Sequence, residues 1–357
     1  MTVIKNISTA LLKAPLQQPF RTARGDHNSL ENVLFAIELG DGTKGFGEAA
    51  VATHITGETI EQTTRNLKLV GRSLIGRDAS DYLKISAQLH EQLLLNKCAL
   101  AAIETALVDA LTRQKKIPLW KFFGKRSRKL KSDITIVIGD LKETEDSVLT
   151  YFKQGFRAFK VKIGRNEDLD YERVLAVKRL APRAAIYLDA NQGYSAEQTL
   201  RFLKRLEEAN VRPDLVEQPV PCEDWEGLKK VTRSTKVPVC ADESARSLAD
   251  VIKIIKHKAA PVINIKLTKT GIFESHAIAL LARSKGIKLM VGGMMETSLA
   301  MTASAHMAAG LGGFDFIDLD TPFFIKDAIK RNPFLNSRGI YDFKTAKAGI
   351  GITPDDI

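Results

Sequence analysis

The run AIYLDAN at residues 185–191 is one of eight short apolar runs that end in polar or charged residues. The repetition of this pattern along the chain indicates the fold. The others have the same form, and they are ITIVI (134–138), FKVKI (159–163), DLVEQ (214–218), PVCADE (238–243), VINIK (262–266), KLMVGG (288–293) and FDFIDLD (314–320). Equivalent positions in successive runs are 24 to 28 residues apart. That spacing fits one strand, one helix and two short loops.

The stretches between the runs have helical periodicity. YERVLAVKRLA (171–181) and AEQTLRFLKRLEEAN (196–210) place apolar residues three and four positions apart, as one face of a helix does. Eight short buried strands that alternate with helices predict an α/β chain that folds as a (β/α)8-type barrel.

The first 112 residues have a different pattern. Segments 2–14 and 32–49 alternate like antiparallel strands, with a turn at Asp41-Gly42. Three helices are expected after them, at 58–70, 78–95 and 98–112. This part of the chain therefore predicts a separate α+β unit, and the segment after about residue 325 is too short to form a domain of its own.

Composition narrows the class of protein. The 357 residues are 44% hydrophobic, which excludes disordered and fibrous classes. No window approaches the roughly 18 apolar residues of a membrane span, and the N-terminus is not a convincing signal peptide. Three distant cysteines form no disulfide framework, so we expect a cytoplasmic protein. Nine basic residues between 113 and 131 account for most of the net charge of +11.

Three acidic residues close three consecutive predicted strands, namely Asp189, Glu217 and Asp242. Chemistry in such barrels lies at the carboxyl ends of the strands, so these carboxylates should converge. Converging carboxylates repel one another, and a hard divalent cation such as Mg2+ resolves this with oxygen ligands. One such acid alone would more often cap a helix or meet solvent, but three on successive strands predict a site for one Mg2+ per subunit.

Lysines flank the acidic residues on both sides. Lys160 and Lys162 precede Asp189 by one strand, and Lys266 ends the strand after Asp242. Alternation along a strand directs all three lysines into the barrel. Two opposed bases are what a racemase or epimerase requires, since one removes a proton and the other returns it from the opposite face. The metal would hold a substrate carboxylate and stabilise the enediolate, and we expect lowered lysine pKa values beside it.

The motifs in this order resemble the enolase superfamily, and within it the muconate-lactonizing-enzyme subgroup. They are KVKIG (160–164), LDANQG (188–193), VEQPV (216–220), ADES (241–244), NIKLTKTG (264–271) and VGGMMET (291–297). The resemblance covers nearly the whole chain and implies an α+β capping domain over a (β/α)7β TIM-like barrel. The implied boundaries are residues 1–125 for the cap, 126–325 for the barrel and 326–357 for a tail that completes the cap.

The resemblance also implies roles at matching positions. Asp189, Glu217 and Asp242 resemble the Mg2+ ligands, and Lys162 and Lys266 resemble the acid/base pair. Further positions resemble residues around the metal or the substrate, namely Lys160 beside the substrate carboxylate, Asn191 and Glu296 near the metal site, and Thr135, Gly293 and Met295 as substrate contacts. No histidine stands at 266 or at 291–296, which disfavours the mandelate-racemase branch.

Two acids on the last predicted strand distinguish reactions within the subgroup. Asp318 and Asp320 form a DxD that resembles the dipeptide epimerases, where it holds the substrate's free α-ammonium group. Two inward carboxylates make a site for a cation, and neither muconate nor succinylbenzoate offers one. The simpler alternative is that one Asp caps a helix and the other pairs with a barrel lysine.

The sequence therefore predicts an isomerase, a Mg2+-dependent dipeptide epimerase that inverts the α-carbon of the C-terminal residue. L-Ala-D/L-Glu is the default substrate, with Arg24 as the contact for the Glu side chain. Arg24 is shifted by one position from the family pattern, so hydrophobic and cationic dipeptides stay open. His27 and His54 are expected to be loop residues rather than catalysts.

Other functions stay open at this point. Within the subgroup the alternatives are an o-succinylbenzoate synthase, an N-acylamino-acid racemase or a cycloisomerase. A basic nucleic-acid-binding protein is a more remote alternative, because residues 113–131 lack the interleaved aromatics of a stacking platform. We expect a homo-oligomer that acts on a small molecule, without a nucleic-acid or membrane partner.

Overall fold

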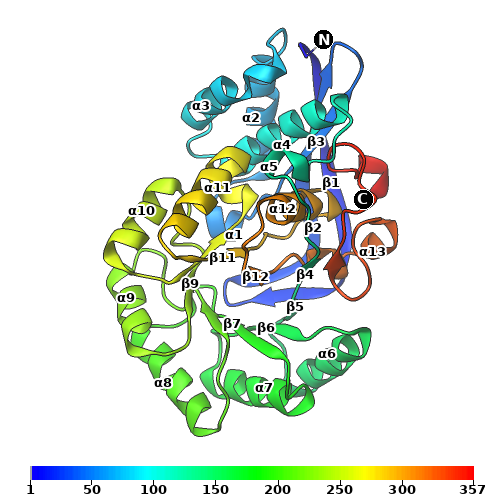
Figure 1. The fold of residues 1–357 in the computed structure, drawn as a ribbon. Coiled ribbons are helices and arrows are strands. Elements are labelled where there is room, and N and C mark those ends of the chain that lie inside the picture. Colours follow the sequence, from blue (N-terminus) through cyan, green and yellow to red (C-terminus); the bar gives the residue numbers. More distant parts are fainter. Residues whose placement is uncertain (1) are drawn as a thin grey trace.

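The computed structural model describes residues 2–357 and confirms the predicted barrel (Figure 1). Within these residues, eight parallel strands form one curled sheet in which neighbours follow the order of the chain. The strands are β5 (Ile134–Ile136), β6 (Ala158–Lys162), β7 (Ala185–Asp189), β8 (Leu215–Glu217), β9 (Val239–Ala241), β10 (Val262–Ile265), β11 (Lys288–Val291) and β12 (Phe316–Ile317). Each strand lies in one of the eight predicted runs, except that β6 begins one residue earlier than its run.

Helices connect the successive strands and give the (β/α)7β order. They are α6 (Leu141–Gln154), α7 (Glu167–Leu180), α8 (Ala196–Glu208), α9 (Trp225–Ser234), α10 (Leu248–His257), α11 (Leu267–Ser284) and α12 (Ser298–Leu311). α8 begins with a capping box in which the Ser195 side chain accepts from the Gln198 N–H and Gln198 accepts in return. No helix within residues 2–357 is long and apolar enough to cross a membrane.

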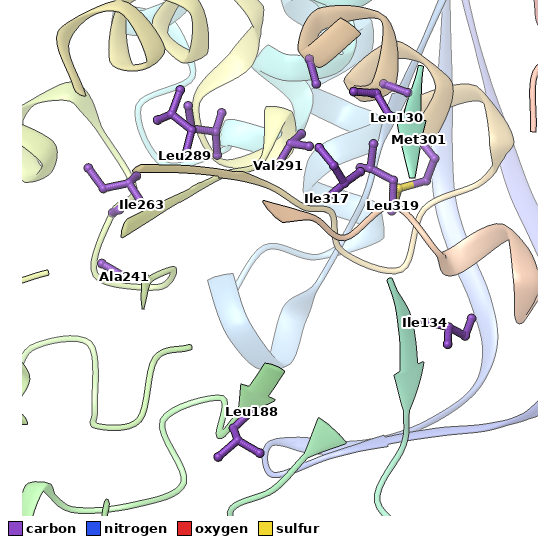
Figure 2. Close-up of a cluster of buried hydrophobic side chains, with 14 of the residues drawn as sticks. Leu130, Ile134, Leu188, Ala241, Ile263, Leu289, Val291, Met301, Ile317 and Leu319 are labelled. Carbon is purple, nitrogen blue, oxygen red and sulfur yellow. The ribbon is translucent and has the colours of Figure 1, made fainter. Parts of the chain in front are cut away.

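Apolar side chains on the outer face of the sheet pack against these helices. Figure 2 shows part of this core, with Leu188, Ile263 and Leu289 among the side chains that form it. All three are fully or almost fully buried. Burying a Leu or Ile side chain stabilises a fold by about 1.5–3 kcal/mol, so this layer holds the helices against the sheet.

Inside the barrel the side chains form layers. An apolar layer near the amino ends of the strands contains Leu215, Cys240, Val262, Met290 and Phe316, with Tyr187 packed against it. Residues two positions further along share the same face of each strand, and these are Asp189, Glu217, Asp242, Asn264, Gly292 and Asp318. The period of two therefore places a polar layer directly above an apolar plug.

The barrel closes between its first and last strands without a regular ladder. The Asp133 N–H donates to the Ile317 carbonyl over 2.9 Å, and the Leu319 N–H donates to Ser132 Oγ over 2.9 Å. The Thr135 N–H donates to Asp320 Oδ2 over 2.5 Å. Closure therefore brings the segment before β5 next to the DxD.

The N-terminal part forms a three-stranded antiparallel sheet with helices, as predicted. Its elements are β1 (Ile4–Thr22), β2 (Gly25–Leu39), β3 (Lys44–Ala49), α1 (Thr53–Thr56), α2 (Ile60–Arg72), η1 (Ala79–Asp81), α3 (Tyr82–Gln92), α4 (Lys97–Gln114) and α5 (Trp120–Phe123). The β1–β2 hairpin is long and reaches down to the barrel (Figure 1). Its tip pairs there, because the Ile138 N–H donates to the Arg21 carbonyl over 3.1 Å and Arg165 forms an ion pair with Asp26.

The C-terminal segment contacts both the N-terminal part and the barrel. It contains η2 (Thr321–Phe323), α13 (Ala328–Arg331), β13 (Ile340–Tyr341) and η3 (Pro354–Asp356), and β13 pairs with β4 (Leu130–Lys131). The Ile350 N–H donates to Asp109 of α4 over 2.7 Å. Ile350's carbonyl lies 3.0 Å from His306 Nε2 on α12. The exact domain boundaries stay a prediction.

The basic segment at 113–131 lies at this junction. Arg113 forms an ion pair with Asp109 over 2.8 Å, and Lys129 forms one with Asp342 over 2.8 Å. Arg113 and Lys129 therefore contribute ion pairs within the protein.

Removal of the Asp109 carboxylate should destabilise the molecule. Asp109 is fully buried and accepts hydrogen bonds from the N–H groups of Phe46 and Ile350 and from Arg113. Asp109→Ala leaves these donors without a partner, and we expect a loss of about 3–5 kcal/mol in the free energy of unfolding. Urea denaturation measures the loss, and the exposed Asp81→Ala serves as control. Equal stabilities of the two variants would contradict this role for Asp109.

The free energy of unfolding should decrease as the pH is lowered, because His306 is buried as a neutral imidazole. Burial lowers its pKa to about 3, although the Ile350 carbonyl opposes the shift. The unfolded chain has a His pKa of about 6.5, so the stabilisation is complete above that pH and is lost as pH falls from 6.5 towards 3.

Urea denaturation at a series of pH values should show this loss. It should be smaller in His306→Gln, and the exposed His257→Gln should keep the wild-type dependence. A His306→Gln variant with the wild-type pH profile would refute the assignment.

Candidate active site

A cavity of about 520 Å3 lies between the barrel mouth and the N-terminal part, which is a usual size for a small-molecule site. Its floor includes Lys160, Lys162 and Lys266 from the barrel. Its roof includes apolar residues from the β1–β2 hairpin and the segment around α1, namely Phe20, Leu30, Val51, Ile55 and Ile60. The site is therefore formed by segments far apart in sequence.

The structure brings most of the predicted site residues to this cavity. Nine of them line it, namely Thr135, Lys160, Lys162, Asn191, Lys266, Gly293, Met295, Asp318 and Asp320. Asp189, Glu217 and Asp242 are at most 1% exposed and lie behind the lysines. Arg24 is exposed and is not among the residues that line the cavity.

Lys160 and Lys162 are paired with the acids beside them. Lys160 Nζ lies 2.9 Å from Asp189 Oδ2, 2.8 Å from Glu217 Oε2 and 2.6 Å from Asp318 Oδ2. Lys162 Nζ lies 2.6 Å from Asp189 Oδ2. The register explains these contacts, because Lys162 is directly opposite Asp189 in β7 and Asp189 is opposite Glu217 in β8.

Lys266 approaches from the other side of the barrel. Its Nζ lies 2.6 Å from Asp242 Oδ2, while Lys269 Nζ lies 2.7 Å from Asp242 Oδ1. Lys162 and Lys266 thus pair with different acids and approach the cavity floor from different strands. Lys269 was missed by the sequence analysis, although it stands one helical turn after Lys266 at the start of α11.

The electrostatics of the lysines differ from the expectation of lowered pKa values. Burial alone would lower the pKa of Lys266, but Asp242 and Glu217 outweigh it and raise the pKa. The same balance, with Asp189 and Asp318 as the largest opposing causes, raises the pKa of Lys160. Carboxylates at ion-pair distance therefore keep these lysines protonated in the described state.

The pKa values of the neighbouring acidic residues shift in opposite directions. Burial would raise the pKa of Asp189, but Lys160 and Lys162 outweigh it and hold the pKa below its usual range. Burial and the charge of Asp189 raise the pKa of Glu217 to about 8. The lysine charges are thus too few to compensate every buried carboxylate.

The donor set suits a hard divalent cation. Glu217 Oε2, Asp242 Oδ2 and the neighbouring Glu243 Oε2 are buried and accept no hydrogen bond, although the first two lie near lysine nitrogens. Only carboxylate oxygens are offered, which is the ligand type that Mg2+ prefers. Asn191 lies beside them and donates its N–H to Asp189 Oδ1 over 2.9 Å. The residues present therefore fit the predicted ion.

A second acidic group was only partly predicted. Carboxylate oxygens of Asp133, Asp318 and Asp320 lie within 4.8 Å of one another, and this is the group that the described residues bring closest together. Asp133 was missed, although an acid directly before a buried strand is a signal that could have identified it. Glu296 lies nearby in the loop after β11 and accepts from the Met294 N–H over 2.9 Å.

Two histidines form part of the roof of the cavity. His27 Nε2 and His54 Nε2 are 3.1 Å apart, and both rings line the cavity. Burial and the proximity of His27 lower the pKa of His54 to about 4. Within the described residues, neither ring forms a hydrogen bond or ion pair with the acidic residues at the floor. The prediction that both are loop residues is wrong, because His27 lies in strand β2 and His54 lies in helix α1.

Comparisons with known proteins agree with this geometry. Residues 6–124 match the N-terminal domain of the mandelate racemase / muconate lactonizing enzyme family, and residues 143–357 match the enolase C-terminal domain-like model. A hydrophobic dipeptide epimerase of Citrifermentans bemidjiense is 45% identical over 98% of both chains. An aromatic dipeptide epimerase of Herpetosiphon aurantiacus is 40% identical over 94% of this chain and 93% of its own.

A solved structure provides a further comparison. The dipeptide epimerase of Enterococcus faecalis, crystallised with Mg and the dipeptide L-Leu-L-Tyr, superposes with a TM-score of 0.93. It is 30% identical and covers 98% of this chain and 99% of its own. From the barrel, the buried lysine and carboxylate network and these matches over nearly all of its length, the chain belongs to the mandelate racemase / muconate lactonizing enzyme family of the enolase superfamily.

Proposed function

We propose that the protein is a Mg2+-dependent isomerase, a dipeptide epimerase that inverts the α-carbon of the C-terminal residue. The observation that carries this proposal is the placement of Lys162 and Lys266 on opposite sides of a cavity whose floor also presents Asp318 and Asp320. Opposed bases suit inversion of a carbon acid. Paired carboxylates suit the ammonium group of an unblocked dipeptide.

Each group on the cavity floor has a task in this proposal. One lysine accepts the α-proton as a neutral amine, and the other, as an ammonium group, donates a proton to the opposite face of the carbon. Lys160 offers its charge to the substrate carboxylate. Asp189, Glu217 and Asp242 hold Mg2+, which supplies charge stabilisation for the enediolate when bound.

The substrate side chain is proposed to be hydrophobic rather than acidic. Arg24, the expected partner of a Glu side chain, is exposed and outside the cavity. The roof instead offers Phe20, Ile55 and Ile60 together with the histidine pair. This favours a preference like those named for the hydrophobic and aromatic dipeptide epimerases over the default L-Ala-D/L-Glu.

The alternative reactions lack a supporting observation of this kind. The substrates of cycloisomerisation and o-succinylbenzoate synthesis give Asp318 and Asp320 no cation to bind. An N-acylamino acid has no α-ammonium group, because its α-nitrogen is acylated. The remote nucleic-acid reading predicts salt-dependent binding through residues 113–131, which filter binding at two salt concentrations tests. A homo-oligomer in the cytoplasm stays a prediction, and light scattering measures the oligomeric state.

Loss of either opposed lysine should abolish epimerisation. We expect Lys162→Ala and Lys266→Ala each to reduce the rate by about 10²- to 10⁴-fold, since each removes one acid/base group. Each variant should still exchange the α-proton of the one epimer that faces its remaining lysine. NMR in D2O with each epimer of L-Ala-Leu measures inversion and exchange separately. Inversion that survives both changes would sink the mechanism, and the exposed Lys142→Ala serves as control.

Metal removal should stop both exchange and inversion. Dialysis against EDTA should abolish α-proton exchange, because the acidic residues would lose the ion that stabilises the enediolate. Added Mg2+ should restore the wild-type rate but not that of Asp189→Asn or Glu217→Gln. Full activity after exhaustive chelation would rule out a metal-dependent reaction, whatever the outcome for the lysines.

A further inference from the structure

Asp133 is a buried carboxylate without a partner in the protein. It directly precedes β5, is 1% exposed, and its backbone N–H is held by the Ile317 carbonyl. Neither of its carboxylate oxygens accepts a hydrogen bond. Burying an unpaired carboxylate costs several kcal/mol, so either a cation from outside the polypeptide or a proton must compensate its charge.

The direction of this carboxylate is fixed by closure of the barrel. Its oxygens lie within 4.8 Å of those of Asp318 and Asp320. Asp320 is anchored by the Thr135 N–H, and Asp318 by Lys160. Asp318 and Asp320 line the cavity, and Asp133 is not among its lining residues. The three acids thus converge next to the substrate site.

The buried lysines at the barrel mouth are also too few to balance the buried carboxylates there. Within the described residues the buried charged side chains there comprise eight carboxylates and four lysines, namely Asp133, Asp189, Glu217, Asp242, Glu243, Glu296, Asp318 and Asp320 against Lys160, Lys162, Lys266 and Lys269. One Mg2+ would offset two of the four excess negative charges. A zwitterionic dipeptide adds no net charge, so the balance leaves room for a further cation or for protons.

We propose that Asp133 completes a three-carboxylate cation site with Asp318 and Asp320. The ligand is a compact cation that several carboxylate oxygens can contact at once. It is either the ammonium group of the dipeptide or a free metal cation that occupies the site when no dipeptide is bound. The ammonium case rests on the proposed function, and the metal case does not. A proton on Asp133 is the competing explanation, because burial and the two neighbouring acids raise its pKa.

The variant Asp133→Asn distinguishes a charged carboxylate from a protonated one, because Asn matches the neutral acid in shape. If the carboxylate holds the ammonium group, calorimetry in Mg2+ should show L-Ala-L-Leu binding weakened about tenfold or more. The des-amino analogue, in which the ammonium is replaced by hydrogen, should bind wild type and variant alike. Asp214→Asn is the matched control, since Asp214 is an exposed acid directly before β8.

The second arm of the experiment measures Mn2+ binding, which does not depend on catalytic turnover. Equilibrium dialysis of the metal-free protein should give two bound Mn2+ per chain in wild type and one in Asp133→Asn, if the free cation is the ligand. Addition of L-Ala-L-Leu should then displace one Mn2+ from wild type only. Thermal midpoints of all variants show that the fold is retained.

The two arms separate the possible results. A change in either arm that is confined to Asp133→Asn supports the site and identifies its source. An unchanged dipeptide affinity together with an unchanged Mn2+ count overturns the proposal and assigns a proton to Asp133. A wild-type protein that epimerises no dipeptide but binds a second Mn2+ through Asp133 would refute the proposed function and leave the cation site standing.

Discussion

Compensation of buried charge at the carboxyl ends of the barrel strands is the constraint on which the site depends. Lys160 illustrates it, because its ammonium group lies within 2.9 Å of Asp189, Glu217 and Asp318 at once. Removing such a lysine would leave several carboxylates unpaired in a site shielded from water, which is costly. The lysines that we assign to chemistry are therefore also the counter-ions that allow the acidic residues to be buried together.

The site also requires that the N-terminal residues that form the roof of the cavity are held over the barrel mouth. Glu48 at the end of the first sheet accepts hydrogen bonds from the N–H and the hydroxyl of Thr297, which follows the loop after β11. Asn32 of β2 donates to the Met295 carbonyl in that loop over 2.8 Å. The roof is thus anchored beside the residues that line the cavity. Contacts of the C-terminal segment with Asp109 and His306 hold the same two parts together at the outer side.

Much of the fold and of the site was predictable, because it depends on local patterns. The eight runs gave the strands and their order, and alternation placed Lys160, Lys162, Asp189, Glu217 and Asp242 inside the barrel before any contact was known. The pKa values of Lys160 and Lys266 are raised rather than lowered by the carboxylates beside them. The prediction differed because it assumed a metal and the ion pairs were not visible in the sequence. Arg24 lies in the turn between β1 and β2, and its side chain is exposed and is not among the residues that line the cavity.

The residues that face the barrel interior can be identified from each strand alone, because side chains alternate with a period of two. The partners that those residues meet depend on the closed barrel. Lys160 and Asp318 are 158 residues apart, and they come within 2.6 Å because the sheet curls until its two edges meet. The same closure places Asp133 beside the DxD. No local pattern encodes that distance, because it follows from the number of strands and their register around the whole barrel.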